Sequence, residues 1–181
     1  MGLHDNTVQE ALNRHLGKVI RVTPTIQAAA YDAGDVLFLT TEIPNAVPVK
    51  GGTSRLVGIN VLDQADQGKD IDIIFMQVST NLISSLSPGS SGGVAISDAD
   101  ALTAKILGNT NINFSDNFFD LINLRMTTAG GSDNNQYDSP LPILLQAEDD
   151  STSVYFAAKA REAYTAAAID DLTFTFHIEY R

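Results

Sequence analysis

Hydrophobic and polar residues alternate along much of this chain, and the clearest example is the segment 172–180. One set of alternate positions in this segment is apolar and consists of Leu172, Phe174, Phe176, Ile178 and Tyr180. The other set is polar and consists of Thr173, Thr175, His177 and Glu179. Alternation with a period of two predicts a β-strand that places one face on a hydrophobic core and the other toward solvent.

Comparable runs, separated by turns rich in Gly, Asp, Asn and Ser, occur throughout the chain and predict about nine strands. The runs are 18–27, 35–43, 52–64, 71–78, 109–114, 118–128, 141–147, 153–160 and 171–180. Parallel strands need crossover helices, and the sequence offers almost none. We therefore predict a mainly β fold, an antiparallel two-sheet sandwich that is jelly-roll-like.

Three local expectations refine this fold. Pro24 interrupts the first run, which favours an edge position for that strand. The runs 52–64 and 71–78 are joined by a polar loop that contains Gly68, and this arrangement predicts a hairpin. The segment 158–168 is compatible with a helix, but it lies between two strong strand patterns, and we interpret it as a strand end followed by a connection.

Two short helices are also predicted. In residues 1–17, apolar residues recur at helical spacing, Thr7 and Glu10 form a capping box, and Gly17 is placed to end the helix. The apolar positions are Val8, Ala11, Leu12 and Leu16. This helix is too short to be stable alone, so it must lie on the domain or on a partner. We therefore expect an N-terminal helical arm (1–17) and a β-sandwich domain (18–181). A second helix of one or two turns is expected just before Gly108.

Composition and charge exclude several functions. The chain has 181 residues and a formal charge of −11, from 22 acidic and 11 basic residues, and the basic residues are scattered singly. An acidic surface repels phosphate backbones, so no nucleic-acid partner is expected. Cysteine is absent, which excludes disulfides and thiol chemistry. We find no signal peptide or membrane span. We therefore expect synthesis in the cytoplasm, and we expect no membrane partner.

One short motif suggests catalysis. Residues 89–93 match G-x-S-x-G, the nucleophile elbow of many hydrolases, and Asp170 or Asp171 followed by His177 completes the order of a triad. An elbow requires a strand before the serine and a helix after it, whereas here Pro88 precedes the motif and no helix start follows. We interpret these residues as a flexible loop and expect no catalytic residues.

No cofactor or metal site is expected either. His4, His15 and His177 are isolated in the sequence, and no zinc motif is present. The loop 63–70 has a weak likeness to a calcium loop, but position twelve is Ile74 instead of glutamate. We interpret this loop as a hairpin turn, although calcium binding by one of the acidic loops stays open.

Aromatic residues suggest a core more than a ligand site. Sugar-binding surfaces usually contain tryptophan, which is absent here, and most phenylalanines lie in alternating strands. Phe114, Phe118 and Phe119 flank a turn and are either core residues or a contact patch. If the latter, Phe118 and Phe119 are candidates for contact with a partner, together with Val8, Leu12 and Leu16 of the arm.

Three stretches of the chain resemble a group of virion proteins of tailed bacteriophages, the head decoration or cement proteins. They are "VTPTIQAAAYDAGDVLF", "LVGINVLDQADQGKDIDIIFMQV" and "LPILLQAEDDSTSVYFAAKAREAYTAAAIDDLTFTFHIE". The resembling features are a Tyr-x-x-Gly-Asp turn, a "VLD…DQG…D" segment and a closing pair of strands. Together they cover roughly residues 22–179.

The resemblance implies a non-enzymatic protein on the outer capsid surface of a virion. Such a protein bridges major capsid subunits and stabilises the assembled lattice by binding only to it. It also implies a homo-oligomer, most simply a trimer, with a dimer as the alternative. Two other hypotheses remain: a receptor- or carbohydrate-binding jelly-roll domain of a phage tail or fibre, and a serine or glycoside hydrolase.

Overall fold

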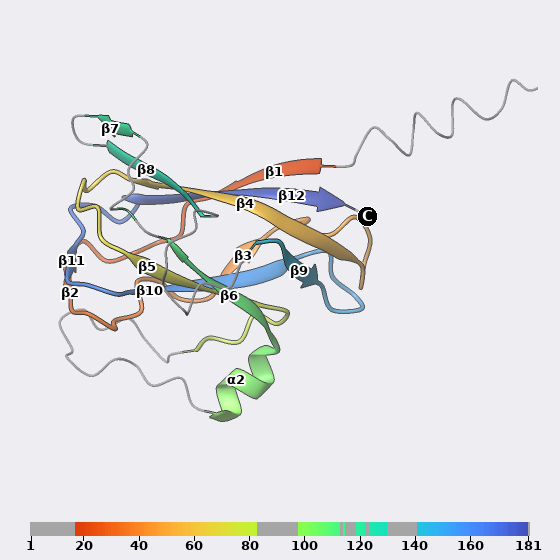
Figure 1. Ribbon diagram of the computed structural model, residues 1–181. Coiled ribbons are helices and arrows are strands. Elements are labelled where there is room, and N and C mark those ends of the chain that lie inside the picture. Colours follow the sequence, from red (N-terminus) through yellow and green to blue (C-terminus); the bar gives the residue numbers. More distant parts are fainter. Residues whose placement is uncertain are drawn as a thin grey trace, which may run out of the picture.

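The computed structural model describes residues 17–82, 98–112, 114, 119–121, 124–129 and 141–180. Within these residues the protein is mainly β, and two layers of strands face each other (Figure 1). The strands are β1 (Gly17–Val22), β2 (Ala30–Tyr31), β3 (Thr41–Ile43), β4 (Thr53–Asp63), β5 (Ile71–Met76), β6 (Ile106–Ile112), β7 (Phe119–Leu121), β8 (Leu124–Ala129), β9 (Ile143–Gln146), β10 (Val154–Ala160), β11 (Tyr164–Thr165) and β12 (Leu172–Tyr180), with one helix, α2 (Asp98–Ala104), between β5 and β6.

The strands form two principal antiparallel sheets. The large sheet has the order β1-β12-β4-β8-β7, with β9 also paired to β4, and the small sheet has the order β3-β10-β5-β6. The orders β1-β12-β4-β9 and β3-β10-β5-β6 are those of a jelly roll, in which two Greek keys are folded together. The predicted fold class is therefore confirmed. A short pair, β11 and β2, lies at one end of the sandwich (Figure 1).

Aromatic side chains fill the space between the two sheets. Phe156 on the small sheet lies 5.1 Å from Phe174 and 4.9 Å from Phe176 on the large sheet, measured between ring centroids. Phe38 contacts Phe156 at 5.2 Å, and all four rings are fully buried. Edge-to-face pairs of this kind add to the free energy that burial itself contributes. The predicted inward row of β12 is confirmed by this packing.

The predicted hairpin of 52–64 and 71–78 is wrong. β4 pairs with β12, β8 and β9, whereas β5 pairs with β10 and β6, so the connection crosses from one sheet to the other. Each strand has one buried row facing the same core, but from opposite layers. An alternating pattern identifies the buried row of a strand and cannot tell in which layer the strand lies.

Two other local expectations need correction. The run 35–43 is one strand only at Thr41–Ile43, while Val36 makes an isolated bridge to Lys159. The expected helix ends at Ala104, ahead of Gly108, because Lys105 has a φ of +51° and directs the chain into β6, where Gly108 lies. By contrast, β1 lies at the edge of the large sheet, as Pro24 predicts, and the segment 158–168 contains a strand end and a connection.

Several expectations fall outside the described residues. These are the N-terminal helix before Gly17, the arm residues Val8, Leu12 and Leu16, the G-x-S-x-G motif at 89–93, and Phe118. Phe119 begins β7 and pairs with Met126. Phe114 is buried in the main core, which agrees with the core alternative for this residue.

Candidate functional site

The outer face of the large sheet carries an unusual set of exposed residues. The inward row of β12 is buried, so the alternate residues of β12, of its neighbours β1 and β4, and of β9, which pairs with β4, point away from the core. We call these residues the outer face of the large sheet: Val19, Arg21, Arg55, Val57, Asn60, Leu144, Thr175, His177 and Glu179. Three of them are large apolar side chains that are about half exposed or more, with 62% for Val19, 47% for Val57 and 58% for Leu144.

A β-bulge shapes the centre of this face. His177 pairs with Gly58 and Ile178 pairs with Leu56, so Val57 is an extra residue on β4. A bulge turns the side chain of the extra residue and leaves it outside the ladder. A Cβ at Gly58 would lie 3.6 Å from the Cβ of His177, so the imidazole lies against this glycine.

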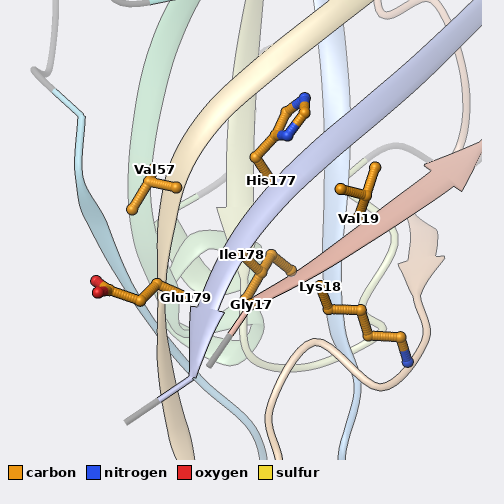
Figure 2. Close-up of a pocket in the computed structure, with 7 residues that line it drawn as sticks. All are labelled: Gly17, Lys18, Val19, Val57, His177, Ile178 and Glu179. Carbon is orange, nitrogen blue, oxygen red and sulfur yellow. The ribbon is translucent and has the colours of Figure 1, made fainter. Parts of the chain in front are cut away.

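The bulge borders a shallow groove with a volume of about 450 Å³. The lining residues, shown in Figure 2, are Gly17, Lys18, Val19, Val57, His177, Ile178 and Glu179. His177 lies between the two valines, and its Nε2 is 3.1 Å from Nδ2 of Asn60. The groove thus combines apolar walls with a histidine, a lysine and a glutamate, and its lining contains no aromatic platform for a sugar ring.

The basic residues of the described chain fall into two groups. Those of the first group have ion-pair partners: Lys69 with Glu162, Lys105 with Glu148, and both Lys159 and Arg161 with Asp72. Within the described residues, Lys18, Arg21 and Arg55, on or beside the outer face of the large sheet, have none, and neither does Lys50 in the turn before β4. Among the residues that define this face, Glu179 is the one carboxylate, so this set is basic in a chain of net charge −11. This arrangement favours binding of an anionic, partly apolar surface.

The outer face of the small sheet is different. Its apolar residues Met76 and Ala157 pack with Leu82 and with Ala104 of α2 in a second buried cluster. Figure 1 shows α2 on the side of the small sheet that faces away from the large sheet. The helix and the segment that leads to Leu82 therefore cover part of this face.

Two of the three motifs that carry the phage resemblance form turns at one end of the sandwich, and the third lies in β10 and β12. Oδ1 of Asp63 accepts hydrogen bonds from the N–H of Ala65 at 3.1 Å and from the hydroxyl of Tyr164 at 3.0 Å. Oδ2 accepts from the N–H groups of Gln67 at 2.9 Å and Gly68 at 3.1 Å. A carboxylate with four donors holds the loop that connects the two sheets. These interactions make Asp63 a structural residue.

The Tyr-x-x-Gly-Asp turn has a similar structural role. The hydroxyl of Tyr31 donates to the carbonyl of Leu37 at 3.2 Å and accepts from the N–H of Gln27 at 2.8 Å. Gly34 has a φ of +98°, which a residue with a side chain rarely adopts. Oδ2 of Asp35 accepts from the N–H of Asp32 at 2.8 Å. The turn thus joins three segments of chain around one buried tyrosine.

Burial is the largest cause that raises the pKa of Tyr164, and the neighbouring Asp63 carboxylate raises it further. Tyr31, whose ring centroid is 6.3 Å from that of Tyr164, also has a raised pKa, chiefly because of burial. Both hydroxyls therefore stay protonated in the folded protein at neutral pH and serve as hydrogen-bond donors.

The acid and histidine of the suggested triad have other partners. Oδ2 of Asp171 accepts from the N–H groups of Ala167 at 2.6 Å and Ala168 at 2.8 Å. His177 contacts Asn60, as described above. Ser91 lies outside the described residues, so the described structure does not bring the three suggested triad members together.

The loop 63–70 is not arranged as a calcium loop. Asp63 accepts from backbone N–H groups, and Oδ1 of Asp70 accepts from the N–H of Phe114 at 3.0 Å. In the part of the chain that the structure describes, no group of three or more His, Asp or Glu side chains converges as a metal site would require.

Comparisons with known proteins give no assignment. The sequence matches no protein-family model, and it matches no curated protein. Among the described residues, no helix has the length and apolar character needed to cross a membrane.

The sequence analysis missed the outer face of the large sheet as a site. The bulge at Val57 was not foreseen, because a bulge leaves no mark in the pattern of hydrophobic residues. Arg21 gave a usable signal, since it alternates with the buried Ile20 and must point outward. Nothing in the sequence indicated that it lacks an ion-pair partner.

Proposed function

We propose that this protein is a non-enzymatic virion component of a tailed bacteriophage, a cement or decoration protein of the outer capsid surface. It binds the assembled lattice as a small oligomer, a trimer in the simplest case, and bridges neighbouring major capsid subunits. Its effect is thermodynamic, because a ligand of the assembled state alone shifts the equilibrium toward assembly. When one oligomer makes several weak contacts with the lattice, each bound contact raises the effective concentration for the next, so that the oligomer binds more tightly than a single copy.

The observation that supports this proposal most directly is the structural role of the residues in the motifs that resemble phage decoration proteins. Tyr31, Asp35 and Asp63 fasten turns and the connection between the sheets. A resemblance that lies in turns and strand faces should reflect a shared scaffold, and these residues have such a scaffold role. The exposed residues are then free to serve for docking, as the basic and apolar outer face of the large sheet suggests.

Carbohydrate or receptor binding by a tail domain is the competing hypothesis. The phenylalanines whose side chains the structure describes are all buried, namely Phe38, Phe75, Phe114, Phe156, Phe174 and Phe176, and the groove beside His177 is lined by no described Phe or Tyr. Sugar recognition by aromatic stacking therefore has little support in the described residues.

Copy number in purified virions tests the proposal against this competitor. We expect hundreds of copies per particle by quantitative mass spectrometry, because a decoration protein follows the symmetry of the capsid lattice. Capsids without the protein should also release DNA at a lower temperature than capsids to which it has been added back. A handful of copies per virion, or none, would contradict the proposal.

Deletion of residues 1–16 tests the arm hypothesis separately. The cut leaves Gly17, which pairs with Glu179 in the large sheet, and so retains the whole of β1. We expect a folded protein by circular dichroism that no longer occupies capsids. The triple substitution of Val8, Leu12 and Leu16 by serine should have the same effect without shortening the chain. Retained occupancy in both variants would show that the arm is dispensable.

A further inference from the structure

We infer that the outer face of the large sheet is a contact between copies of this chain, occupied by a carboxylate-bearing surface of the neighbouring copy. The inference rests on the proposed function only for the expectation of an oligomer. The surface itself is argued from charge, exposed apolar area and size, and it is tested on the purified protein.

Unpaired cations are the first support. Arg21 is exposed and Arg55 is half-buried, and within the described residues neither has an ion-pair partner. The described acidic side chains outnumber the basic ones, and the cations of the small sheet and, apart from Lys50, those of the turns have partners among them. Guanidinium groups bind carboxylates in planar, two-bonded geometry, so two such groups on one face favour an acidic protein surface.

Exposed apolar side chains on the same face are the second support. Val19, Val57 and Leu144 come from three different strands, and the cations lie among them along the same sheet. Isolated exposed apolar residues are ordinary, but a group that is interspersed with Arg is typical of contact surfaces. The face therefore combines the hydrophobic and the electrostatic part of an interface.

The size of the face is the third support. Four strands about 4.8 Å apart, with nine residues of β12 at about 3.3 Å each, give a face of roughly 570 Å². Covering this area on one copy and a similar area on the next buries roughly 1,100 Å² in total, close to the lower limit of specific interfaces. We therefore expect reversible association.

The chain itself supplies the complementary surface. Asp149 and Asp150 are adjacent and exposed, and neither has an ion-pair partner among the described residues. Their turn is fixed, because the N–H of Gly51 donates to the carbonyls of Glu148 and Ser151, each at 3.0 Å. A rigid turn with two carboxylates is a suitable partner for an arginine-bearing face.

The charge of the face also determines the kind of symmetry. A two-fold dimer that pairs this face with itself would bring Arg21 and Arg55 of both copies together, and Glu179 is the one carboxylate among the residues that define the face. Contact with a different surface avoids this repulsion. Head-to-tail contacts of that kind close into rings when the rotation between copies permits. This geometry agrees with a trimer and disfavours a two-fold dimer.

The test compares matched substitutions on and off the face. Val19 is 62% exposed and Ile169, in the turn before β12 and off both proposed contact surfaces, is 58% exposed, so Ile169→Asp is a control for Val19→Asp. Arg21→Glu is matched with Lys69→Glu, which changes the net charge equally at a surface cation of the loop between β4 and β5, outside both proposed contact surfaces. Association is measured by sedimentation velocity and native mass spectrometry at about 1–100 µM, a range that reveals concentration dependence.

We expect the wild-type protein to self-associate and to dissociate in high salt. Val19→Asp and Arg21→Glu should each weaken association by about tenfold or more, and the two controls by less than about twofold. Thermal unfolding followed by circular dichroism verifies that all variants remain folded. A wild-type protein that stays monomeric throughout this range would overturn the inference, as would controls that weaken association as much as the face variants do. If the wild type is monomeric and the face variants lose capsid occupancy, the occupant is a capsid subunit and the inference is wrong, while the proposed function stands.

Discussion

The two outer faces of the sandwich differ in whether their side chains have partners. On the small sheet, apolar residues lie under Leu82 and α2, and Asp72 pairs with Lys159 at 3.3 Å and Arg161 at 3.8 Å. On the large sheet, two valines, a leucine and Arg21 are exposed and Arg55 is half-buried, and none of them has such a partner in the described chain. Both faces belong to antiparallel sheets over one core, so the fold alone does not require this difference.

This difference separates stability from docking. A face whose groups are already paired contributes to the free energy of folding and offers little to a partner. A face with unpaired cations and exposed apolar area contributes little to folding and retains its interactions for association. The expected effects of substitutions should therefore follow the face on which they lie.

The largest effect is expected for a charge placed on the covered face. Ala157 is 3% exposed, so Ala157→Asp buries a carboxylate without a partner and should lower the free energy of unfolding by about 3 kcal/mol or more. Val57→Asp on the outer face of the large sheet should lower it by about 1 kcal/mol or less, because Val57 is 47% exposed. Urea unfolding followed by circular dichroism measures both values. Equal losses in the free energy of unfolding for Ala157→Asp and Val57→Asp would contradict the proposed difference between the two faces.

A smaller effect is expected where a buried polar group has a partner. Tyr164→Phe removes the hydroxyl that donates to Asp63 at 3.0 Å and should lower the free energy of unfolding by about 1.5–3 kcal/mol at pH 7. The pKa of Tyr164 is raised in the folded protein, so the stabilisation that depends on the neutral hydroxyl is complete below the unfolded pKa of about 10 and is lost as the pH rises above it.

The wild type should therefore lose stability between pH 9 and about 11, and Tyr164→Phe should lose less over that interval. Tyr155→Phe is the control, since Tyr155 is half-buried on the outer side of the small sheet. Urea unfolding at several pH values measures this dependence. An identical alkaline loss in the wild type and in Tyr164→Phe would assign the pH dependence to other groups.

The smallest effects compare charged residues on the two faces. Asp72→Asn weakens two ion pairs and should lower the free energy of unfolding by about 0.5–1 kcal/mol at low salt, with most of the difference lost in 1 M NaCl. Arg55→Gln removes a cation that has no ion-pair partner in the described residues, and its effect should stay within about 0.5 kcal/mol at any salt concentration. A destabilised Arg55→Gln would show that this cation serves the fold.

The alternation of residues made the fold class and the core of this protein predictable. The row Phe174, Phe176 and Ile178 identifies a strand because its period is independent of the rest of the chain. The position of β4 and β5 in different sheets was not predictable, because layer assignment depends on contacts between residues far apart in the sequence. Arg21 was assignable to an outward position because local alternation is enough for that. Its lack of an ion-pair partner and the bulge at Val57 were not predictable, because both depend on strands that are distant in the sequence.

The position of β12 determines the order in which the large sheet can form. β12 lies between β1 and β4, and its residues Thr175 and Glu179 pair with Arg21 and Gly17 at the other end of the described chain. During synthesis, neither β1 nor β4 can therefore pair with β12, the strand that lies between them, until β12 has left the ribosome. Sequence-distant pairing of this kind slows folding and leaves strand edges unpaired in the nascent chain. Truncation within β12 should for this reason yield an aggregation-prone product instead of a smaller folded domain.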